Sequence, residues 1–262
     1  MIEARLATYK ELNQLDKLLA SYGSYESLCE GLIKLKLFNS FDDLSKEMLH
    51  ALGLSYDESS QKPAALMRPL EELVFCFVDL EASSSLKQGG QIMEIGAIKY
   101  KAGQELGRFE CLLQVPFIDI SVQKVTGIEM SMLEGACNMK QALFSFKEFL
   151  QDSVFVAHNA LFDHRFLSVF LCEIGIGPLL NPRLCSFELA TRCMDAPRFG
   201  LDALKEILGI KLPAHRAFND AFSCAGIFFH CLKMCDIKNT KELFSYKIKL
   251  KESACTKSPT SS

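Results

Sequence analysis

The stretch LVFCFVDLEA, residues 73 to 82, is almost continuously apolar and rich in side chains that favour strands. A strand that is buried on both faces has this composition, and such strands lie in the middle of α/β sheets. Two acids, Asp79 and Glu81, stand near its end. Side chains two residues apart on a strand point to the same face, so the two carboxylates are expected to lie together.

Two acids at the end of a buried strand repel each other and lose hydration, which is costly unless a cation neutralises them. Taken alone, Asp79 and Glu81 are equally well explained as the solvated end of a strand that reaches the surface. The choice between a cation site and a solvated strand end therefore depends on the rest of the chain.

Periodicity and turn residues predict the elements that follow this strand. In chain order they are strands at 92–101 and 107–115, a helix at 138–151, a strand at 154–157, and helices at 159–173, 187–195, 201–208 and 217–233. A turn at Ala102 to Gln104 joins the second and third strands, which predicts an antiparallel meander of three strands. Strands first, followed by strands alternating with helices, indicate an α/β fold with a mixed sheet flanked by helices, over residues 71–235.

The two ends of the chain differ from this domain in composition. Residues 1 to about 55 carry leucines at helical spacing and predict a small, all-helical N-terminal domain. The polar, proline-bearing segment SYDESSQKPAAL (55–66) is typical of a linker, so this unit and its linker are expected to span residues 1–66. Residues 236–262 form a basic tail whose tip is expected to be disordered.

The overall composition excludes several classes of protein. A chain of 262 residues with 49% hydrophobic side chains is neither disordered nor fibrous. A net charge of -3 does not make a general nucleic-acid binder, so any such binding has to be local. The eleven cysteines include no CxxC pair, and no signal peptide or membrane-spanning run occurs. We therefore expect a cytoplasmic protein with free thiols and no membrane partner.

Two further acids lie on predicted helices. Asp163 stands one turn into its helix, and apolar residues at core-facing spacing follow it, so its side chain is expected to point toward the sheet. An acid that interacts with the helix dipole is the alternative explanation. Asp220 lies on the apolar stripe of its helix, which is unusual for a carboxylate. His215 precedes it by five residues, although a lone histidine is more often structural than catalytic.

Together these residues carry a family resemblance. The segments DLE (79–81), AHNALFD (157–163) and HRAFNDA (215–221) resemble the three exonuclease motifs of the DEDDh family of 3'-5' exonucleases. Within that family, the chain most resembles the proofreading epsilon subunit of bacterial DNA polymerase III. The order and spacing fit over residues 73–233, whereas residues 1–70 are not covered. The resemblance implies a ribonuclease-H-like fold with a five-stranded mixed sheet and two divalent metal ions.

The resemblance also implies roles for the polar residues. Asp79, Glu81, Asp163 and Asp220 would hold two Mg²⁺ or Mn²⁺ ions, because hard cations prefer carboxylate oxygens and a pair of ions can act on both oxygens of a phosphodiester. His215 would accept the proton of the attacking water as a general base. On this interpretation HRAFNDAF (215–222) supplies both the base and the last metal ligand.

Several residues are predicted to bind the strand end. Leu80 and Phe162 would flank the terminal base. Asn159 would bond a phosphate or the terminal sugar, or act only as the N-cap of its helix. The family usually has Thr-Thr-Gly after the first motif, and here Ala82 and Ser83 begin the corresponding triplet, which puts nucleotide affinity in doubt more than the chemistry.

The expected function is that of a DNA 3'-5' exonuclease of the proofreading or repair type, which releases nucleoside monophosphates. Its partners would be a single-stranded or frayed 3' end of DNA and a DNA polymerase subunit. An RNA 3'-end exonuclease on the same scaffold is an alternative, because the motifs do not read the 2'-hydroxyl. A non-catalytic module that binds strand ends or a polymerase is the other.

Overall fold

The computed structural model describes residues 9–21, 24–60 and 62–245. The helices are α1 (Tyr9–Ser21), α2 (Tyr25–Lys34), α3 (Lys46–Ala51), α4 (Ala64–Met67), α5 (Ile120–Thr126), α6 (Met139–Leu150), α7 (Ala160–Glu173), α8 (Ser186–Cys193), α9 (Leu201–Leu208) and α10 (Ala217–Met234). The strands are β1 (Tyr56–Asp57), β2 (Lys62–Pro63), β3 (Val74–Ala82), β4 (Ile92–Lys101), β5 (Gln104–Leu112), β6 (Val154–Ala157) and β7 (Arg183–Cys185).

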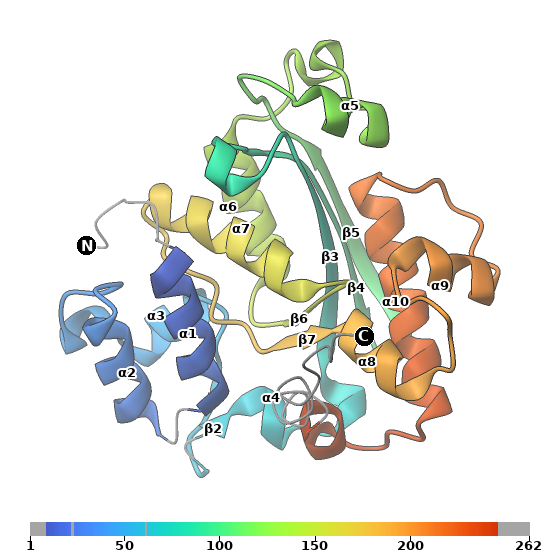
Figure 1. The fold of residues 1–262 in the computed structure, drawn as a ribbon. Coiled ribbons are helices and arrows are strands. Elements are labelled where there is room, and N and C mark those ends of the chain that lie inside the picture. The colour runs from blue at the N-terminus through green and yellow to red at the C-terminus, as the bar shows by residue number, and fades with distance from the viewer. Residues whose placement is uncertain (1–8, 22–23, 61, 246–262) are drawn as a thin grey trace, which may run out of the picture.

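The main sheet has five strands in the order β5-β4-β3-β6-β7 (Figure 1). Strands β3, β4 and β5 are antiparallel neighbours, whereas β6 and β7 run parallel to β3. The predicted meander and the mixed, five-stranded sheet are thus confirmed. β5 begins three residues earlier than expected, because Ala102 and Gly103 both adopt positive φ and form a two-residue turn.

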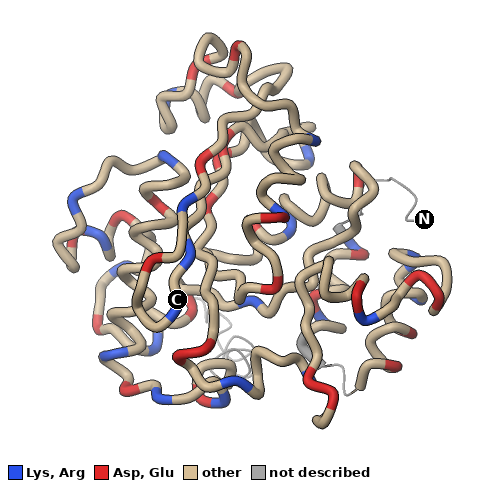
Figure 2. The backbone as a smooth tube through the Cα atoms, turned by 180° about the vertical axis from the view of Figure 1, so that it is seen from behind, with Lys and Arg blue, Asp and Glu red and all other residues tan. Residues whose placement is uncertain are grey.

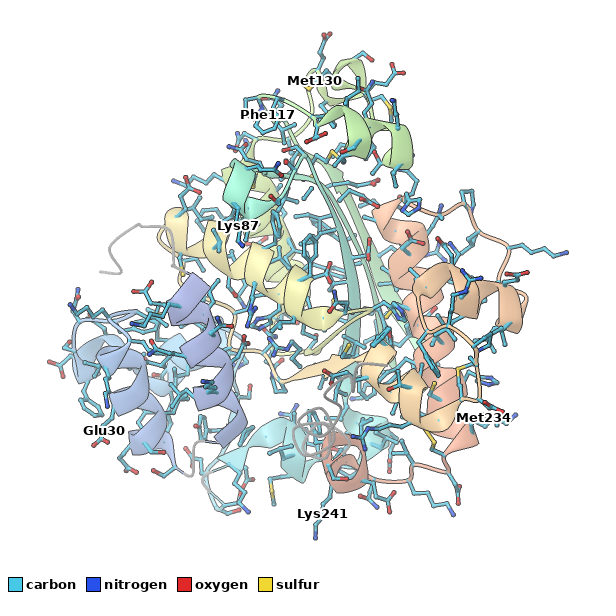
Figure 3. All side chains as sticks on the ribbon, in the orientation of Figure 1. Glu30, Lys87, Phe117, Met130, Met234 and Lys241 are labelled. Carbon is cyan, nitrogen blue, oxygen red and sulfur yellow. A yellow bond between two sulfur atoms is a disulfide. The ribbon has the colours of Figure 1, made fainter. Side chains whose placement is uncertain are left out.

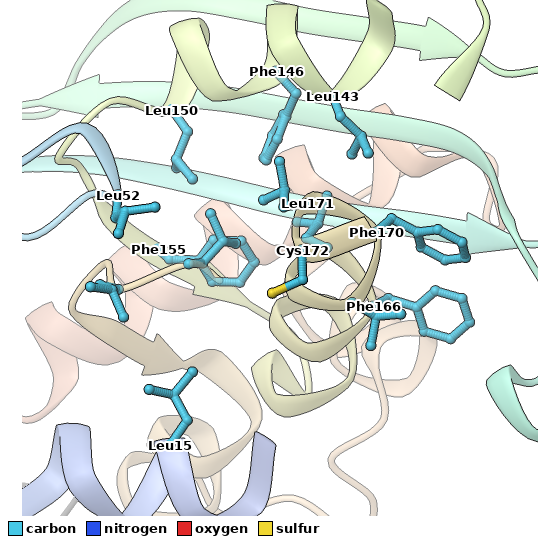
Figure 4. Packing of buried hydrophobic residues seen from close by; sticks show 14 of the residues in the cluster. Leu15, Leu52, Leu143, Phe146, Leu150, Phe155, Phe166, Phe170, Leu171 and Cys172 are labelled. Atoms are coloured by element: carbon cyan, nitrogen blue, oxygen red, sulfur yellow. The ribbon is translucent and has the colours of Figure 1, made fainter. Parts of the chain in front are cut away.

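Alternate side chains of β3 point to opposite faces of the sheet and contribute to two separate core layers. Cys76 and Val78 belong to a buried cluster that also contains residues of α6 and α7, such as Phe146 and Leu171 (Figure 4). Phe75 and Phe77 point to the other face and pack against Phe228 of α10. Asp79 and Glu81 continue the series of Phe75 and Phe77, so β3 presents the two acids on the face that α10 covers.

The N-terminal helices share the first of these clusters. Leu15 of α1 and Leu52, next to α3, are buried in the same cluster as Phe155 of β6 (Figure 4). Ser24 caps α2, and its hydroxyl accepts a bond from the Ser27 amide. The described part of residues 1–66 therefore packs directly on the main sheet and its helices, and the domain boundary near residue 66 stays a prediction.

A buried ionic contact reinforces this packing. The Asp16 carboxylate of α1 accepts hydrogen bonds from Arg165 of α7, at 2.8 and 3.0 Å, and from Arg183 of β7, at 2.7 Å. All three side chains are at least 85% buried. One carboxylate therefore joins α1 to helix α7 and to strand β7 of the main sheet.

The prediction of free thiols is wrong for one pair of cysteines. Cys193 at the end of α8 and Cys235 just after α10 form a disulfide. The two residues are 42 positions apart, and the packing of α8 along α10 brings their C-terminal ends together, since Ser186 at the start of α8 also lies 3.2 Å from Cys224 in the middle of α10. The other described cysteines are outside this disulfide. The tip of the basic tail, residues 246–262, lies outside the described residues.

Charges of both signs are intermixed over the backbone (Figure 2), as the small net charge predicts. Exposed apolar side chains gather instead on the segment around α5, beyond the end of β3 and β4, where Figure 3 labels Phe117 and Met130. No helix among the described residues is long and apolar enough to cross a membrane.

Candidate active site

The first motif lies at the end of β3, where this central strand extends beyond its neighbour β6. β6 pairs with β3 only as far as Phe77 and Val156, whereas β3 continues to Ala82. The chain leaves β6 and enters α7 at this point, which opens a space beside the end of β3. A pocket of about 230 Å³ occupies that space. Its lining residues are Asp79, Leu80, Glu81, His158, Asn159, Phe162, Asp163, Leu201, Asp202, His215 and Asp220.

The second motif reaches the pocket through a sharp entry into α7. Asn159 takes the left-handed conformation with φ 75°, which asparagine tolerates better than most residues. It occupies the N-cap position, but its side chain makes no capping bond and lines the pocket instead. Asp163 lies one turn further on, is 97% buried, and accepts a backbone bond from Leu80.

The third motif is held against the sheet by small residues. A side chain at Gly96 of β4 would place its Cβ only 2.1 Å from backbone atoms of Ala217 and Phe218, so the backbone of α10 touches the strand. Gly96 is the partner of Asp79 across the β3–β4 ladder. This close approach brings Asp220, in the first turn of α10, against the acids of β3.

The three acids of β3 and α7 strongly perturb one another. Burial, followed by the charges of Asp163 and Glu81, raises the pKa of Asp79 well above its ordinary value. Burial and the neighbouring Asp220 raise the pKa of Glu81 to about 7. Burial, with the charge of Glu81, raises the pKa of Asp163 to about 8. The cluster is therefore short of positive charge, as a cation site without its cation should be.

Asp220 differs because a cation already contacts it. Lys205 of α9 donates from Nζ to Asp220 Oδ1 at 3.1 Å, and the His215 backbone N–H donates to Asp220 Oδ2 at 2.7 Å. Lys205 is 95% buried and also lies 3.6 Å from Asp202. Lys205 and Asp202 were not among the residues predicted from the sequence. The available signal was that Lys205 follows Leu201 by four residues and thus lies on the apolar stripe of α9.

Part of the site has the geometry of a metal centre. One ligand atom each from Glu81, His215 and Asp220 lie within 4.8 Å of one another. Carboxylate oxygens dominate the pocket, and its buried acids have raised pKa values that a divalent cation would lower again. The residues present thus fit a hard divalent cation such as Mg²⁺ or Mn²⁺.

The predicted substrate-binding residues fall into two groups. Leu80, Asn159 and Phe162 line the pocket, and the Phe162 ring is 44% exposed while it packs on Phe166 at 4.9 Å. Ala82 and Ser83 do not line it. Ser83 is fully buried, its hydroxyl accepts a bond from the Gln91 amide at 3.0 Å, and its own amide donates to the Gln91 carbonyl.

His158 lines the pocket but is fixed by structural bonds. Its ring nitrogens lie 2.8 Å from Ser186 Oγ and 2.8 Å from the Phe199 carbonyl oxygen. Burial lowers the pKa of this imidazole. Both nitrogens are thus engaged by α8 and by the loop before α9, which gives His158 a structural role.

Comparison with solved structures shows the fold. Exonuclease X in complex with 5' overhanging duplex DNA superposes with a TM-score of 0.52 at 17% identity, over 66% of this chain and 99% of that one. A zinc-bound complex of Escherichia coli exonuclease I with single-stranded DNA gives 0.58 at 16% identity, over 68% of this chain and 43% of that one. The ribonuclease-H-like exonuclease fold expected from the motifs is confirmed.

Comparison of sequences gives the family. The PolC-type DNA polymerase III of Thermotoga petrophila is 31% identical over 216 residues, which is 78% of this chain and 15% of that protein. The chain thus spans only a small part of this relative. The model of the exonuclease family RNase_T matches residues 76–228, which include all three motifs and the pocket. This chain belongs to that exonuclease family.

Proposed function

We propose that the protein is a 3'-5' exonuclease of the DEDDh type that removes nucleoside monophosphates from the 3' end of DNA. The observation that carries the proposal is the convergence of Asp79, Glu81, Asp163, Asp220 and His215 on one pocket. A carboxylate cluster with a histidine at its open side suits the hydrolysis of a phosphodiester. The family membership supports nuclease activity, and the polarity and the subtype are part of the proposal.

Asp79, Glu81, Asp163 and Asp220 would hold two Mg²⁺ or Mn²⁺ ions, which would neutralise the acids and stabilise the negative charge that develops on the phosphodiester. His215 is 45% exposed at the side chain and can reach solvent. It accepts a proton from the attacking water, and the leaving 3' oxygen of the remaining strand is then protonated from solvent.

Leu80 and Phe162 position the terminal nucleotide. Leu80 offers a short apolar wall at the end of β3, and Phe162 offers a half-exposed ring on α7. A base between them gains stacking and apolar contact without sequence preference, as an exonuclease requires. Asn159, whose amide makes no capping bond, is available to a phosphate or to the terminal sugar. Ala82 and Ser83 make no direct side-chain contact in this proposal.

The substrate, partner, pathway and location of the protein in the cell are also part of the proposal. The PolC relative is a DNA polymerase, which favours a single-stranded or frayed DNA end as substrate and a polymerase subunit as partner. Proofreading or repair is the corresponding pathway. A cytoplasmic location remains a prediction from the sequence.

The test uses oligonucleotides labelled at the 5' end, in DNA and in RNA form, with Mg²⁺, with Mn²⁺ and with excess chelator. We expect a ladder of shortened DNA products that disappears with chelator. Faster digestion of RNA would favour the RNA 3'-end exonuclease. Binding without digestion would favour the non-catalytic module. Digestion that is undiminished in chelator would contradict the two-metal mechanism.

A further inference from the structure

His215 is held in an unusual backbone conformation. Its φ is 59°, in the left-handed region that is unfavourable for a residue with a side chain. Such strain persists only where the surrounding structure holds it in place. One bond that does so is the 2.7 Å contact from the His215 amide to Asp220 Oδ2. This bond fixes the backbone but leaves the direction of the imidazole to the residues that follow.

The next two residues are fixed by one carboxylate. Arg216 donates from Nη2 to Glu94 Oε1 at 2.8 Å and from Nε to the same carboxylate at 3.1 and 3.3 Å. The Ala217 amide donates to Glu94 Oε2 at 3.1 Å. Glu94 is 96% buried on β4, so its charge depends on these bonds. Two consecutive residues after His215 are thereby tied to a single point of the sheet.

The strand register places Glu94 next to the predicted metal ligands of β3. Glu94 is the ladder partner of Glu81, one of the predicted metal ligands. Two residues further along β4, the backbone contact at Gly96 prevents α10 from sliding over the strand. Arg216 faces Glu94 through its planar guanidinium, and a bidentate contact of this kind fixes orientation as well as distance.

We propose that Glu94 and Arg216 are positioning residues that hold the His215 imidazole beside Glu81 and Asp220. The Nε and Nη2 groups of the guanidinium both bind Glu94, so this side of the Arg216 fork faces the sheet. Breaking this contact releases the backbone strain at His215 and lets the ring turn away from the pocket. The proposal is tested by enzyme kinetics and by spectroscopy of the histidine rings. The kinetic test rests on the proposed exonuclease function, and the spectroscopic test does not.

The kinetic test compares Arg216→Lys, Arg216→Gln and Glu94→Gln with the wild type on a single-stranded DNA substrate. Arg216→Lys keeps the charge and loses the bidentate geometry. We expect kcat to fall about 10- to 100-fold in all three, with KM changed less than about threefold. In a His215→Ala background the same substitutions should lower kcat no further, because their effect passes through that ring. A full additional loss in that background would overturn the proposal.

Arg108→Gln is the matched control. Arg108 also makes a two-bond contact with a glutamate, Glu105, at 2.6 and 3.0 Å, and its guanidinium lies 5.3 Å from the ring of Phe218 at the start of α10. It therefore touches the same helix without bonding to the residues next to His215. We expect its kcat to stay within twofold of the wild type.

The spectroscopic test records the ring carbon–proton signals of the five histidines, with His215 assigned by its absence from His215→Ala. We expect the His215 signal to shift or broaden in Arg216→Gln and Glu94→Gln and to stay unchanged in Arg108→Gln. If the wild type does not digest DNA but this signal moves, the exonuclease function fails and the positioning role stands. An unmoved His215 signal in the Arg216 and Glu94 variants would overturn the positioning role.

Discussion

Lys205 Nζ lies 3.1 Å from Asp220 Oδ1, and both side chains are more than 90% buried. Most of the charge in this site is negative, and Lys205 supplies a fixed positive charge at one corner of it. Lys205 therefore holds the Asp220 side chain against α9 before any metal ion binds. The other acids, Asp79, Glu81 and Asp163, form no ion pair among the described residues. Burial, together with neighbouring carboxylates, raises their pKa values, and the charge of Arg216 offsets only part of the rise at Glu81.

Replacing Lys205 by methionine should destabilise the metal-free protein by about 3–5 kcal/mol, because it leaves Asp220 as a buried charge without its cation. Saturating Mg²⁺ should raise the unfolding free energy of Lys205→Met more than that of the wild type. The reason is that the ion neutralises the Asp220 carboxylate, which has lost its lysine in the variant. Urea unfolding with and without Mg²⁺ measures both quantities. Lys87→Met, at an exposed lysine (Figure 3), is the control and should change neither. Equal metal effects in Lys205→Met and wild type would contradict this account.

The stability of the metal-free protein should depend on pH through the acid cluster. The folded-state pKa values of Glu81, about 7, and Asp163, about 8, lie above their ordinary values. A carboxyl group of this kind binds its proton more tightly in the folded state, so stability falls as pH rises from the unfolded pKa through the folded one. We therefore expect the stability that protonated Glu81 and Asp163 contribute to the folded state to be lost between about pH 4 and pH 8.

Melting temperatures from pH 5 to 8.5 test this dependence. Asp163→Asn should flatten the slope, because the amide carries no charge to bury at pH 8. Saturating Mg²⁺ should flatten it in the wild type, because the cation favours the ionised carboxylates. A slope that neither the substitution nor the metal ion alters would show that other groups control the pH dependence.

His215→Ala should lower turnover by about 10² to 10⁴, the usual contribution of a general base. Strand-end binding and metal-induced stabilisation should survive, because the carboxylates remain. Single-turnover cleavage and thermal shift with Mn²⁺ measure the two properties separately. His50→Ala, at an exposed histidine remote from the pocket lining, is the control. Turnover within a few-fold of the wild type would remove His215 from the mechanism.

Phe162→Ala should weaken binding of the strand end, with KM raised about tenfold and kcat changed less, because a stacked base is worth about 1–3 kcal/mol. Phe144 on α6 offers a matched control, since its side chain is 45% exposed, against 44% for Phe162, and it does not line the pocket. Phe144→Ala should leave both constants unchanged. If the two variants behave alike, Phe162 has no role in substrate binding.

Asp16→Asn should cost about 3–5 kcal/mol of unfolding free energy, because it leaves the buried guanidinium groups of Arg165 and Arg183 without their shared carboxylate. The surface ion pair between Lys46 and Glu58 offers the control, and Glu58→Gln should cost no more than about 1 kcal/mol. Urea unfolding measures both.

A chain that starts at Ala65 tests the domain boundary itself. Folding of that shorter chain with undiminished stability would show that α1 to α3 add little to the core.

The local sequence determined most of the elements and most of the site. The apolar run at 73–82 specified the central strand, because a nearly continuous run of strand-forming side chains is typical of a strand that is buried on both faces. Asp163 and Asp220 stood out because a carboxylate on an apolar helix stripe needs a reason. These are signals within one strand or one turn of helix, where side-chain spacing alone fixes which residues share a face.

Contacts between distant segments decided the rest. β7 has three residues, too few for alternation, and forms only because β6 offers it an edge. Ser83 turns inward because the Gln91 amide binds its hydroxyl. Lys205 becomes part of the site because α9 packs on α10, and the N-terminal helices join the nuclease core because Asp16 meets two arginines. Each of these outcomes depends on a partner far along the chain, and a periodic pattern carries no information about such partners.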